Sequence, residues 1–116
     1  MGIQVQRKFR LTRSTDFKRV RHKGKSYAHP LLVLIEIKNQ EPITRIGVTA
    51  GKSVGNAVVR NRAKRLLRAA ARDLYPQIRT GHDIMLIARK PIIQVKMPLV
   101  RNALLQLLQR ANLYYE

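Results

Sequence analysis

The chain lacks several features that would suggest particular functions. It has no cysteine, which excludes disulfides, a thiol nucleophile and a cysteine-based zinc site. It has no tryptophan, two phenylalanines and four tyrosines, and shows no paired-aromatic signature of an RRM sheet. No apolar run approaches the roughly 20 residues needed to span a bilayer. The apolar run at 31–37 has only the length of a strand.

Acidic residues are scarce and dispersed. Six Asp and Glu stand against 24 Lys and Arg. No two acids form an obvious acid–base or metal-binding pair in sequence, and the three histidines lack the spacing of metal ligands. We therefore predict no catalytic residue, no metal site and no cofactor held by the protein itself. A protein-only nuclease is disfavoured for the same reason.

The composition predicts one basic globular domain. The 116 residues are enough for a single modest core, and a 45% hydrophobic content is that of a folded chain. A compact domain with a net charge of +18 repels itself in isolation and binds anions. Nucleic acid is the expected partner, because neutralised phosphates release counterions. No membrane partner is predicted, and the cytoplasm is the expected compartment.

The N-terminal segment has no clear periodicity. Residues 1–13 are basic and predict a partly mobile arm. No apolar block precedes Lys8 and Arg10, so a secretory signal is not predicted. A basic mitochondrial transit peptide over 4–21 is the alternative, but Asp16 and the neighbouring apolar and turn signals favour a segment of the fold.

A short basic helix is predicted next. Ser14 is expected as its N-cap and Asp16 lies favourably in its first turn. The helix would run to about His22 and bury Phe17 and Val20. For Phe17 two roles remain open: packing in the core, or a stacking surface for an unpaired base.

Three strands and two further helices follow. Apolar patterns predict strands over 31–38 and 43–50, joined as a hairpin, and a third strand over 83–89. A last helix begins near 97–98 with one apolar face. The predicted fold class is α+β, a single domain over 1–116 of order αββαβα, with helices packed on a small sheet of three or four strands.

The stretch 52–72 carries seven Lys or Arg and no Asp or Glu. Read as a helix from Val59, it has an apolar arc for the core and an adjoining cationic arc. Like charges at i,i+4 repel, so an acid-free face is typical of a helix that binds a polyanion. The cationic arc consists of Arg60, Lys64, Arg68 and Arg72, with Asn61 and Arg65 beside them.

Further donors stand next to predicted element ends. Lys52 and Ser53 precede the long helix, where a helix start attracts phosphate, although an ordinary loop is an equal alternative. The segment 51–55 lacks the spacing of a P-loop. Arg89 and Lys90 end the third strand, where an ordinary charged strand end is the favoured interpretation. They contribute to binding if that strand end and the helix start face one cleft.

The segment 52–68 closely resembles the basic signature of the bacterial ribonuclease P protein subunit, centred on Arg60-Asn61-Arg62. Weaker matches extend the resemblance to about 8–113; they lie at 16–17, 24–26, 45–48 and 83–90. The resemblance implies the αββαβα fold with a left-handed βαβ crossover, against the usual rule. It also implies a small partner of a catalytic RNA that, with Mg²⁺, removes the 5′ leader from precursor tRNA.

The resemblance also assigns roles to residues. The basic helix faces the catalytic RNA through Arg60, Asn61, Arg62, Lys64, Arg65 and Arg68. A cleft between the first helix and the sheet holds the single-stranded leader and is lined by Phe17, Arg21, Lys52, Ser53, Asn56, Arg89 and Lys90. Many family members have an aromatic residue where this chain has Arg21, whose guanidinium can stack or pair with phosphate instead.

The expected assembly contains one protein and one catalytic RNA, requires Mg²⁺ and acts on precursor tRNA. The main alternative is a ribosomal or other structural RNA-binding protein. Composition does not separate the two functions, whereas the ordered Arg-Asn-Arg signature favours ribonuclease P.

Overall fold

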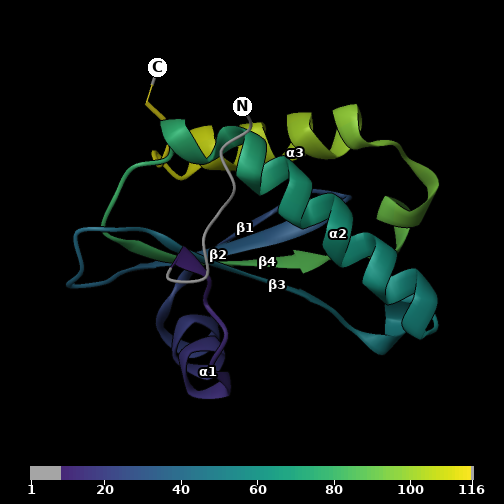
Figure 1. The fold of residues 1–116 in the computed structure, drawn as a ribbon, viewed down its shortest axis with the longest axis horizontal. Helices are drawn as coiled ribbons and strands as arrows, with labels where there is room; N and C mark the ends of the chain where they lie inside the picture. The colour runs from purple at the N-terminus through teal and green to yellow at the C-terminus, as the bar shows by residue number, and fades with distance from the viewer. Residues whose placement is uncertain (1–8, 116) are drawn as a thin grey trace.

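A four-stranded sheet divides the helices into two layers, with α1 on one face and α2 and α3 on the other (Figure 1). The structure is a computed structural model that describes residues 9–115. The helices and strands are α1 Ser14–Lys23, β1 Lys25–Ala28, β2 Leu32–Lys38, β3 Arg45–Ala50, α2 Ala57–Leu74, β4 His82–Ala88 and α3 Met97–Arg110. Three 3-10 turns connect them: η2 Lys52–Val54, η3 Tyr75–Gln77 and η4 Lys90–Gln94.

The sheet order is β1-β2-β4-β3, with β2 antiparallel to both of its neighbours and β3 parallel to β4. The predicted hairpin between 31–38 and 43–50 is therefore wrong, because β4 lies between these two strands. Ile84, Met85 and Leu86 of β4 are all buried, although successive side chains point to opposite faces. A strand that is apolar on both faces is best placed at the centre of a sheet, which is the position β4 takes.

The start of the fold differs from the prediction in two details. The N-cap of α1 is Arg13, which makes no side-chain capping bond, and Ser14 is already helical. The helix extends to Lys23, and the strand β1, Lys25–Ala28, that follows was not predicted. This edge strand is short and mostly exposed, so it has no apolar alternation by which to recognise it.

The sheet carries a core on each face. The larger core lies under α2 and α3, and the smaller core under α1 contains Leu11, Val20, Ile35 and Met85. Leu11 is only 2% exposed, and its N–H donates to the carbonyl of Ile46 at 2.9 Å. The predicted mobile arm is therefore wrong at Leu11, while residues 1–8 lie outside the described part of the chain.

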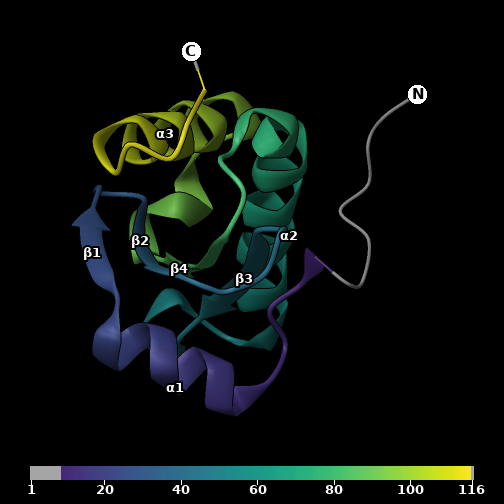
Figure 2. The ribbon, with the colours of Figure 1, turned by 90° about the vertical axis from the view of Figure 1, so that its left-hand side faces the viewer.

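The unit β3–α2–β4 is a left-handed crossover, as the resemblance implied. In Figure 2 the two strands run away from the viewer, α2 returns above the sheet, and β4 lies to the left of β3. Connections of this kind are right-handed in roughly 98% of cases. The unusual hand places α2 over the sheet edge formed by β3, and leaves room for α3 beside it.

The two long helices confirm the predicted apolar faces. In α2, Ala63, Leu67, Ala70 and Leu74 are buried, and α3 buries Val100, Ala103, Leu104, Leu107 and Leu108. The Asn56 side chain caps α2 by accepting the N–H of Val59 at 3.0 Å. Within 9–115 no helix is long and apolar enough to cross a membrane.

Candidate nucleic-acid interface

The outward side of α2 is cationic and lacks neutralising acids. Arg62, Arg65, Arg68 and Arg72 are exposed, and Arg60 and Lys64 are half-buried. The one acid of α2, Asp73, pairs with Arg101 of α3. Within residues 9–115 no carboxylate pairs with the six cations of α2. These charges are therefore available to a polyanion.

A shallow hollow lies on this side of α2. It is lined by Val58, Asn61, Arg65 and Arg68. Val58 is 75% exposed, so an apolar side chain stands in solvent among cations and an amide. This combination suits RNA, which offers phosphates, base edges and ring faces together.

Removing two cations from α2 is expected to weaken RNA binding mainly through phosphate contacts. For the double variant Arg62→Ala, Arg65→Ala, the slope of log K against log salt should flatten by roughly 0.7–0.9 per lost contact. A control variant, Lys38→Ala with Lys96→Ala, removes the same charge from exposed positions outside α2. Filter binding of the catalytic RNA at several salt concentrations measures the affinity and the salt slope of the two variants. Equal slopes for the two variants, with circular dichroism unchanged, would contradict the assignment.

The cations that follow β3 and β4 meet at one edge of the sheet. Ala50 and Ala88 are register partners in parallel strands, so the segments that follow them leave the sheet side by side. Here η2, which begins at Lys52, packs against η4, which begins at Lys90. The Arg89 guanidinium donates to the carbonyl of His29 at 3.4 Å, while Lys52 and Lys90 are exposed.

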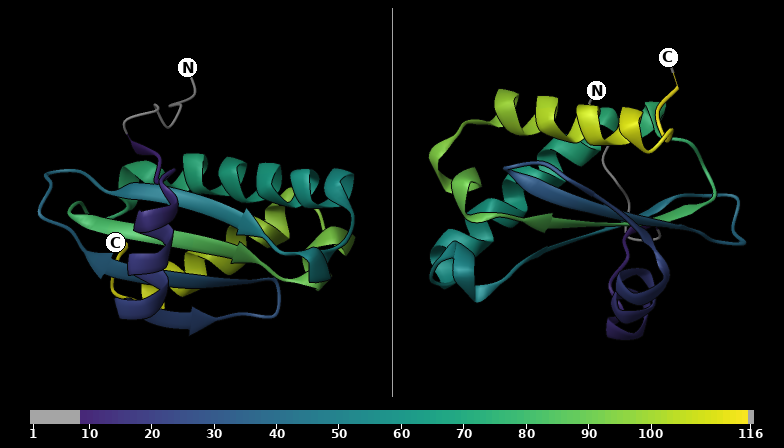
Figure 3. Two further views of the ribbon diagram at one scale, coloured as in Figure 1. Left: turned by 90° about the horizontal axis from the view of Figure 1, so that it is seen from below. Right: turned by 180° about the vertical axis from the view of Figure 1, so that it is seen from behind.

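A second group of the residues predicted to bind the leader lies on the face of the sheet that α1 covers. Helix α1 crosses this face toward one end of the strands (Figure 3). A groove along it is lined by Ser14, Phe17, Lys18, Arg21, Thr49 and Met85. Phe17 is half-buried and packs on the smaller core, so its core role is confirmed and its stacking role remains a prediction.

Gly47 allows the close approach of Phe17 to β3. A Cβ placed at Gly47 would lie 2.5 Å from Cε1 of the Phe17 ring and 2.7 Å from the carbonyl oxygen of Leu11. Any other residue at this position would push the ring away from the sheet. The glycine therefore sets how closely the Phe17 ring can pack on β3.

The structure thus brings the predicted leader residues together as two groups rather than one. Phe17 and Arg21 line the groove under α1, whereas Lys52, Ser53, Asn56, Arg89 and Lys90 belong to the segments beyond the strand ends. Thr49 connects the groups, because it lines the groove and lies three positions before Lys52. Asn56 also has a structural role that was not predicted, because its side chain caps α2.

A buried ion cluster holds α1 against the sheet. Asp83 is fully buried and accepts from Arg45 at 2.8 and 2.9 Å and from Asn39 at 2.9 Å. It also pairs with Arg19 of α1. Burial raises the pKa of Asp83, but the hydrogen bonds from Arg45, Asn39 and Arg19 outweigh it and hold this pKa below its usual value of 3.8. The hydrogen bond to Asp83 in turn raises the pKa of Arg45.

The sequence pattern did not predict this cluster or the position of Arg10 and Leu11 beside β3. The sequence feature that could have predicted the cluster is an acid, Asp83, at the start of an apolar strand. A carboxylate that is buried with such a strand needs cationic partners. Among residues 9–115, no group of three or more His, Asp or Glu is placed to hold a metal ion.

These features define a small, basic RNA-binding protein of the α+β class, with a cationic helix on one side of the sheet and a groove lined by Phe17 on the other. The profile of the family described as Ribonuclease P matches residues 5–112. The ribonuclease P protein component of Bacillus cereus is 37% identical over 114 residues, 97% of this chain and 96% of that protein. The chain belongs to the ribonuclease P protein family.

Solved structures agree with this assignment. The ribonuclease P protein of Staphylococcus aureus superposes with a TM-score of 0.82 at 31% identity, covering 91% of this chain and 97% of that one. A mutant of the S. aureus protein, described as having defective mRNA degradation activity, has a TM-score of 0.84 at 30% identity, with 92% and 91% covered. The chain is thus the accessory subunit of a ribonucleoprotein endoribonuclease that matures tRNA 5′ ends, in which the RNA carries out catalysis.

Proposed function

We propose that the two sides of the sheet bind two different RNA strands. The exposed side of α2 binds the catalytic RNA, and the groove under α1 with the cations beyond β3 and β4 binds the single-stranded leader of precursor tRNA. The observation that carries this proposal is the separation of the two surfaces by the sheet, so that both strands can be bound at once. One protein with one catalytic RNA in the cytoplasm is the assembly we propose.

The leader path follows from the position of the two groups. A base stacked on Phe17 lies over Thr49, and the backbone then continues along β3 toward Lys52. Residues of a strand rise roughly 3.3 Å each, so Thr49 and Lys52, three residues apart, are separated by about 10 Å. Arg89 and Lys90 lie at the same edge and neutralise phosphates as the leader leaves the sheet.

The chemistry belongs to the RNA in this proposal. Magnesium would supply the activated water and stabilise the leaving oxygen, and RNA phosphates would hold it. The described protein residues do not fit a magnesium site, because their carboxylates are dispersed and three of them are in ion pairs with arginine: Asp16, Asp73 and Asp83. The protein contributes charge neutralisation and the position of the leader.

Reconstitution with single omissions tests the proposal. Protein, catalytic RNA and Mg²⁺ together are expected to cut precursor tRNA at one site, and omission of the RNA should abolish that cut. Messenger RNA is a useful second substrate, because a mutant of one S. aureus relative is described by its defective mRNA degradation. Specific cleavage of precursor tRNA by nuclease-free protein alone would overturn the assignment of catalysis to the RNA.

A further inference from the structure

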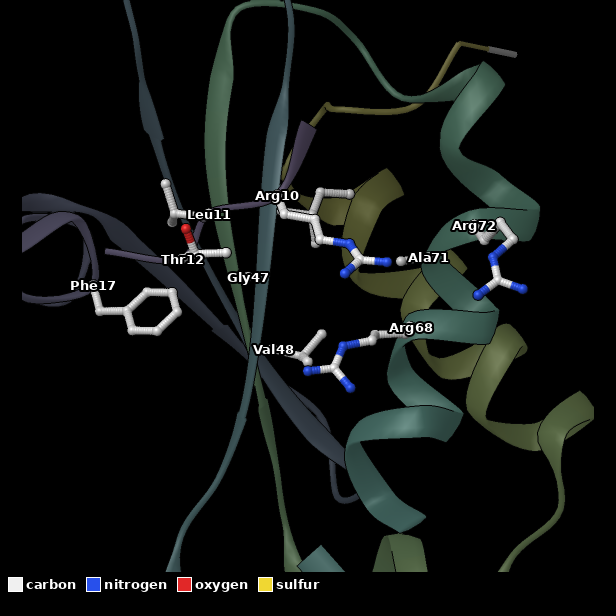
Figure 4. Close-up of a pocket in the computed structure, with 10 residues that line it drawn as sticks. Arg10, Leu11, Thr12, Phe17, Gly47, Val48, Arg68, Ala71 and Arg72 are labelled. Carbon is white, nitrogen blue, oxygen red and sulfur yellow. The ribbon is translucent and has the colours of Figure 1, made fainter. Parts of the chain in front are cut away.

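A third groove lies between α2 and the outer edge of β3 (Figure 4). Most of its lining belongs neither to the proposed leader site nor to the proposed catalytic-RNA surface of α2. Its volume is about 270 Å³. Leu11, Val48 and Ala71 give it an apolar floor, and Arg10, Arg68 and Arg72 surround that floor. Phe17 borders its far end, on the other side of β3 from Arg68.

The charge in this groove has no counterpart in the described protein. No acid lines the groove, and no carboxylate within 9–115 pairs with Arg10, Arg68 or Arg72. Figure 4 shows Arg10 and Arg68 extending toward the groove from opposite sides. Guanidinium groups on two sides of one hollow favour an anion between them, and phosphate fits their donor geometry.

The edge of β3 adds open backbone groups to the groove. The Ile46 carbonyl points away from β4, since it accepts the N–H of Leu11. Val48, two residues further, therefore directs its N–H and C=O to the same outer side. No hydrogen bond from another described segment reaches Val48 there. An edge of this kind can bond to the donors and acceptors of a ligand.

We propose that this groove binds one unpaired nucleotide of the catalytic RNA. Its base lies on Val48 and Ala71 beside the open edge of β3, and its phosphate lies between Arg10 and Arg68. The volume is just below the range of roughly 300–1,000 Å³ for small-molecule pockets, which suits a single ring system. The proposal rests on the proposed function of α2.

The catalytic RNA is the source of the nucleotide because the groove continues the surface of α2. Arg68 lines both this groove and the hollow formed with Val58, Asn61 and Arg65. An RNA strand that contacts the hollow therefore reaches the groove without leaving the protein. The groove under α1 is a separate hollow, which shares only Phe17 with this one.

Filling the groove tests the proposal in the reconstituted holoenzyme. Thr12 lines the groove and is exposed, so Thr12→Trp places an indole in the groove without changing charge or removing a core contact. Affinity for the catalytic RNA should fall at least about fivefold, the lower end of the worth of one stacked base. Thr80→Trp, at an exposed turn, is the matched control and should bind as the unchanged protein does. Melting temperatures of both variants report on folding.

Photo-crosslinking identifies the occupant. Catalytic RNA that contains 4-thiouridine is expected to crosslink to the segments 10–12 or 45–50, and Thr12→Trp should remove these crosslinks. If Thr12→Trp does not fold, the double variant Arg10→Ala, Arg72→Ala takes its place, with Lys38→Ala, Lys96→Ala as the control of equal charge.

Three outcomes would overturn the proposal. The first is that Thr12→Trp leaves the affinity for the catalytic RNA unchanged and that this RNA gives no crosslink in the groove. If cleavage is still RNA-dependent, that result does not contradict the proposed function. Another is a crosslink that arises only from thiouridine in the leader. The third is tight binding of free adenosine monophosphate in the groove of the holoenzyme, which would identify a free nucleotide as the ligand. Failure of RNA-dependent cleavage by the unchanged protein would instead refute the proposed function.

Discussion

Replacing Asp83 with Asn is expected to lower the free energy of unfolding by about 3 kcal/mol, the lower end for a broken buried ion pair. The lower end applies because the side chains of Arg19 and Arg45 are 34% and 28% exposed and can turn partly to water. Asn keeps the shape of Asp83 but cannot balance two guanidinium groups. Urea unfolding followed by circular dichroism measures the change.

The control for this prediction is Asp16→Asn. Asp16 pairs with the same Arg19 at 3.4 Å, but within one turn of α1, and its side chain is 20% exposed whereas that of Asp83 is fully buried. A pair within one helix turn that is partly open to water contributes roughly 0–1 kcal/mol, so this variant should unfold almost as the unchanged protein does. Similar losses for the two variants would contradict a special role for the buried cluster.

The pH dependence of stability gives a second measurement on Asp83. Its folded pKa lies below 3.8, so the unfolded chain takes up this proton first as the pH falls. The stabilisation is therefore present above about pH 4, and it is lost as the pH falls through the folded pKa. Asp83→Asn should have a flatter acid limb. An identical acid limb in both proteins would show that Asp83 does not contribute in this way.

Replacing Phe17 is expected to separate leader binding from stability when two variants are compared. Phe17→Leu keeps an apolar side chain on the smaller core but removes the ring face, so its stability should fall by less than that of Phe17→Ala. The affinity of the holoenzyme for precursor tRNA should fall by roughly 1–3 kcal/mol, the worth of one stacked base. Mature tRNA lacks the leader, and its affinity should hardly change.

The truncation Phe17→Ala supplies the comparison. It removes both the ring face and the packing, so it should lose precursor affinity as the Leu variant does and also unfold earlier. Complete removal of a buried Phe costs roughly 3–5 kcal/mol, and the half-buried position of Phe17 places its cost below that range. Melting temperature and the ratio of precursor to mature tRNA affinity are the readouts. A stability loss in Phe17→Ala with an unaltered ratio in both variants would leave Phe17 a core residue only.

Local periodicity predicted the helices whose buried face can be recognised from the spacing of apolar residues within one segment. The apolar faces of α2 and α3 could be predicted because a repeat near 3.6 residues survives in any surroundings that cover one side of a helix. The cationic side of α2 could be predicted for the same reason. The short strand β1 and the cap of α1 could not, because a four-residue edge strand and an uncapped helix start have no pattern of their own.

The sequence by itself determined the class of the protein: the basic charge, the Arg-Asn-Arg order on one helix and the small number of dispersed acids are properties of the chain. Only the tertiary structure decided which segments are neighbours. It placed β4 between β2 and β3, gathered Arg19, Asn39 and Arg45 around Asp83, and joined Arg10 to the edge of β3 beside Arg68. These contacts depend on pairing between distant strands, and local periodicity does not specify the partner of a strand.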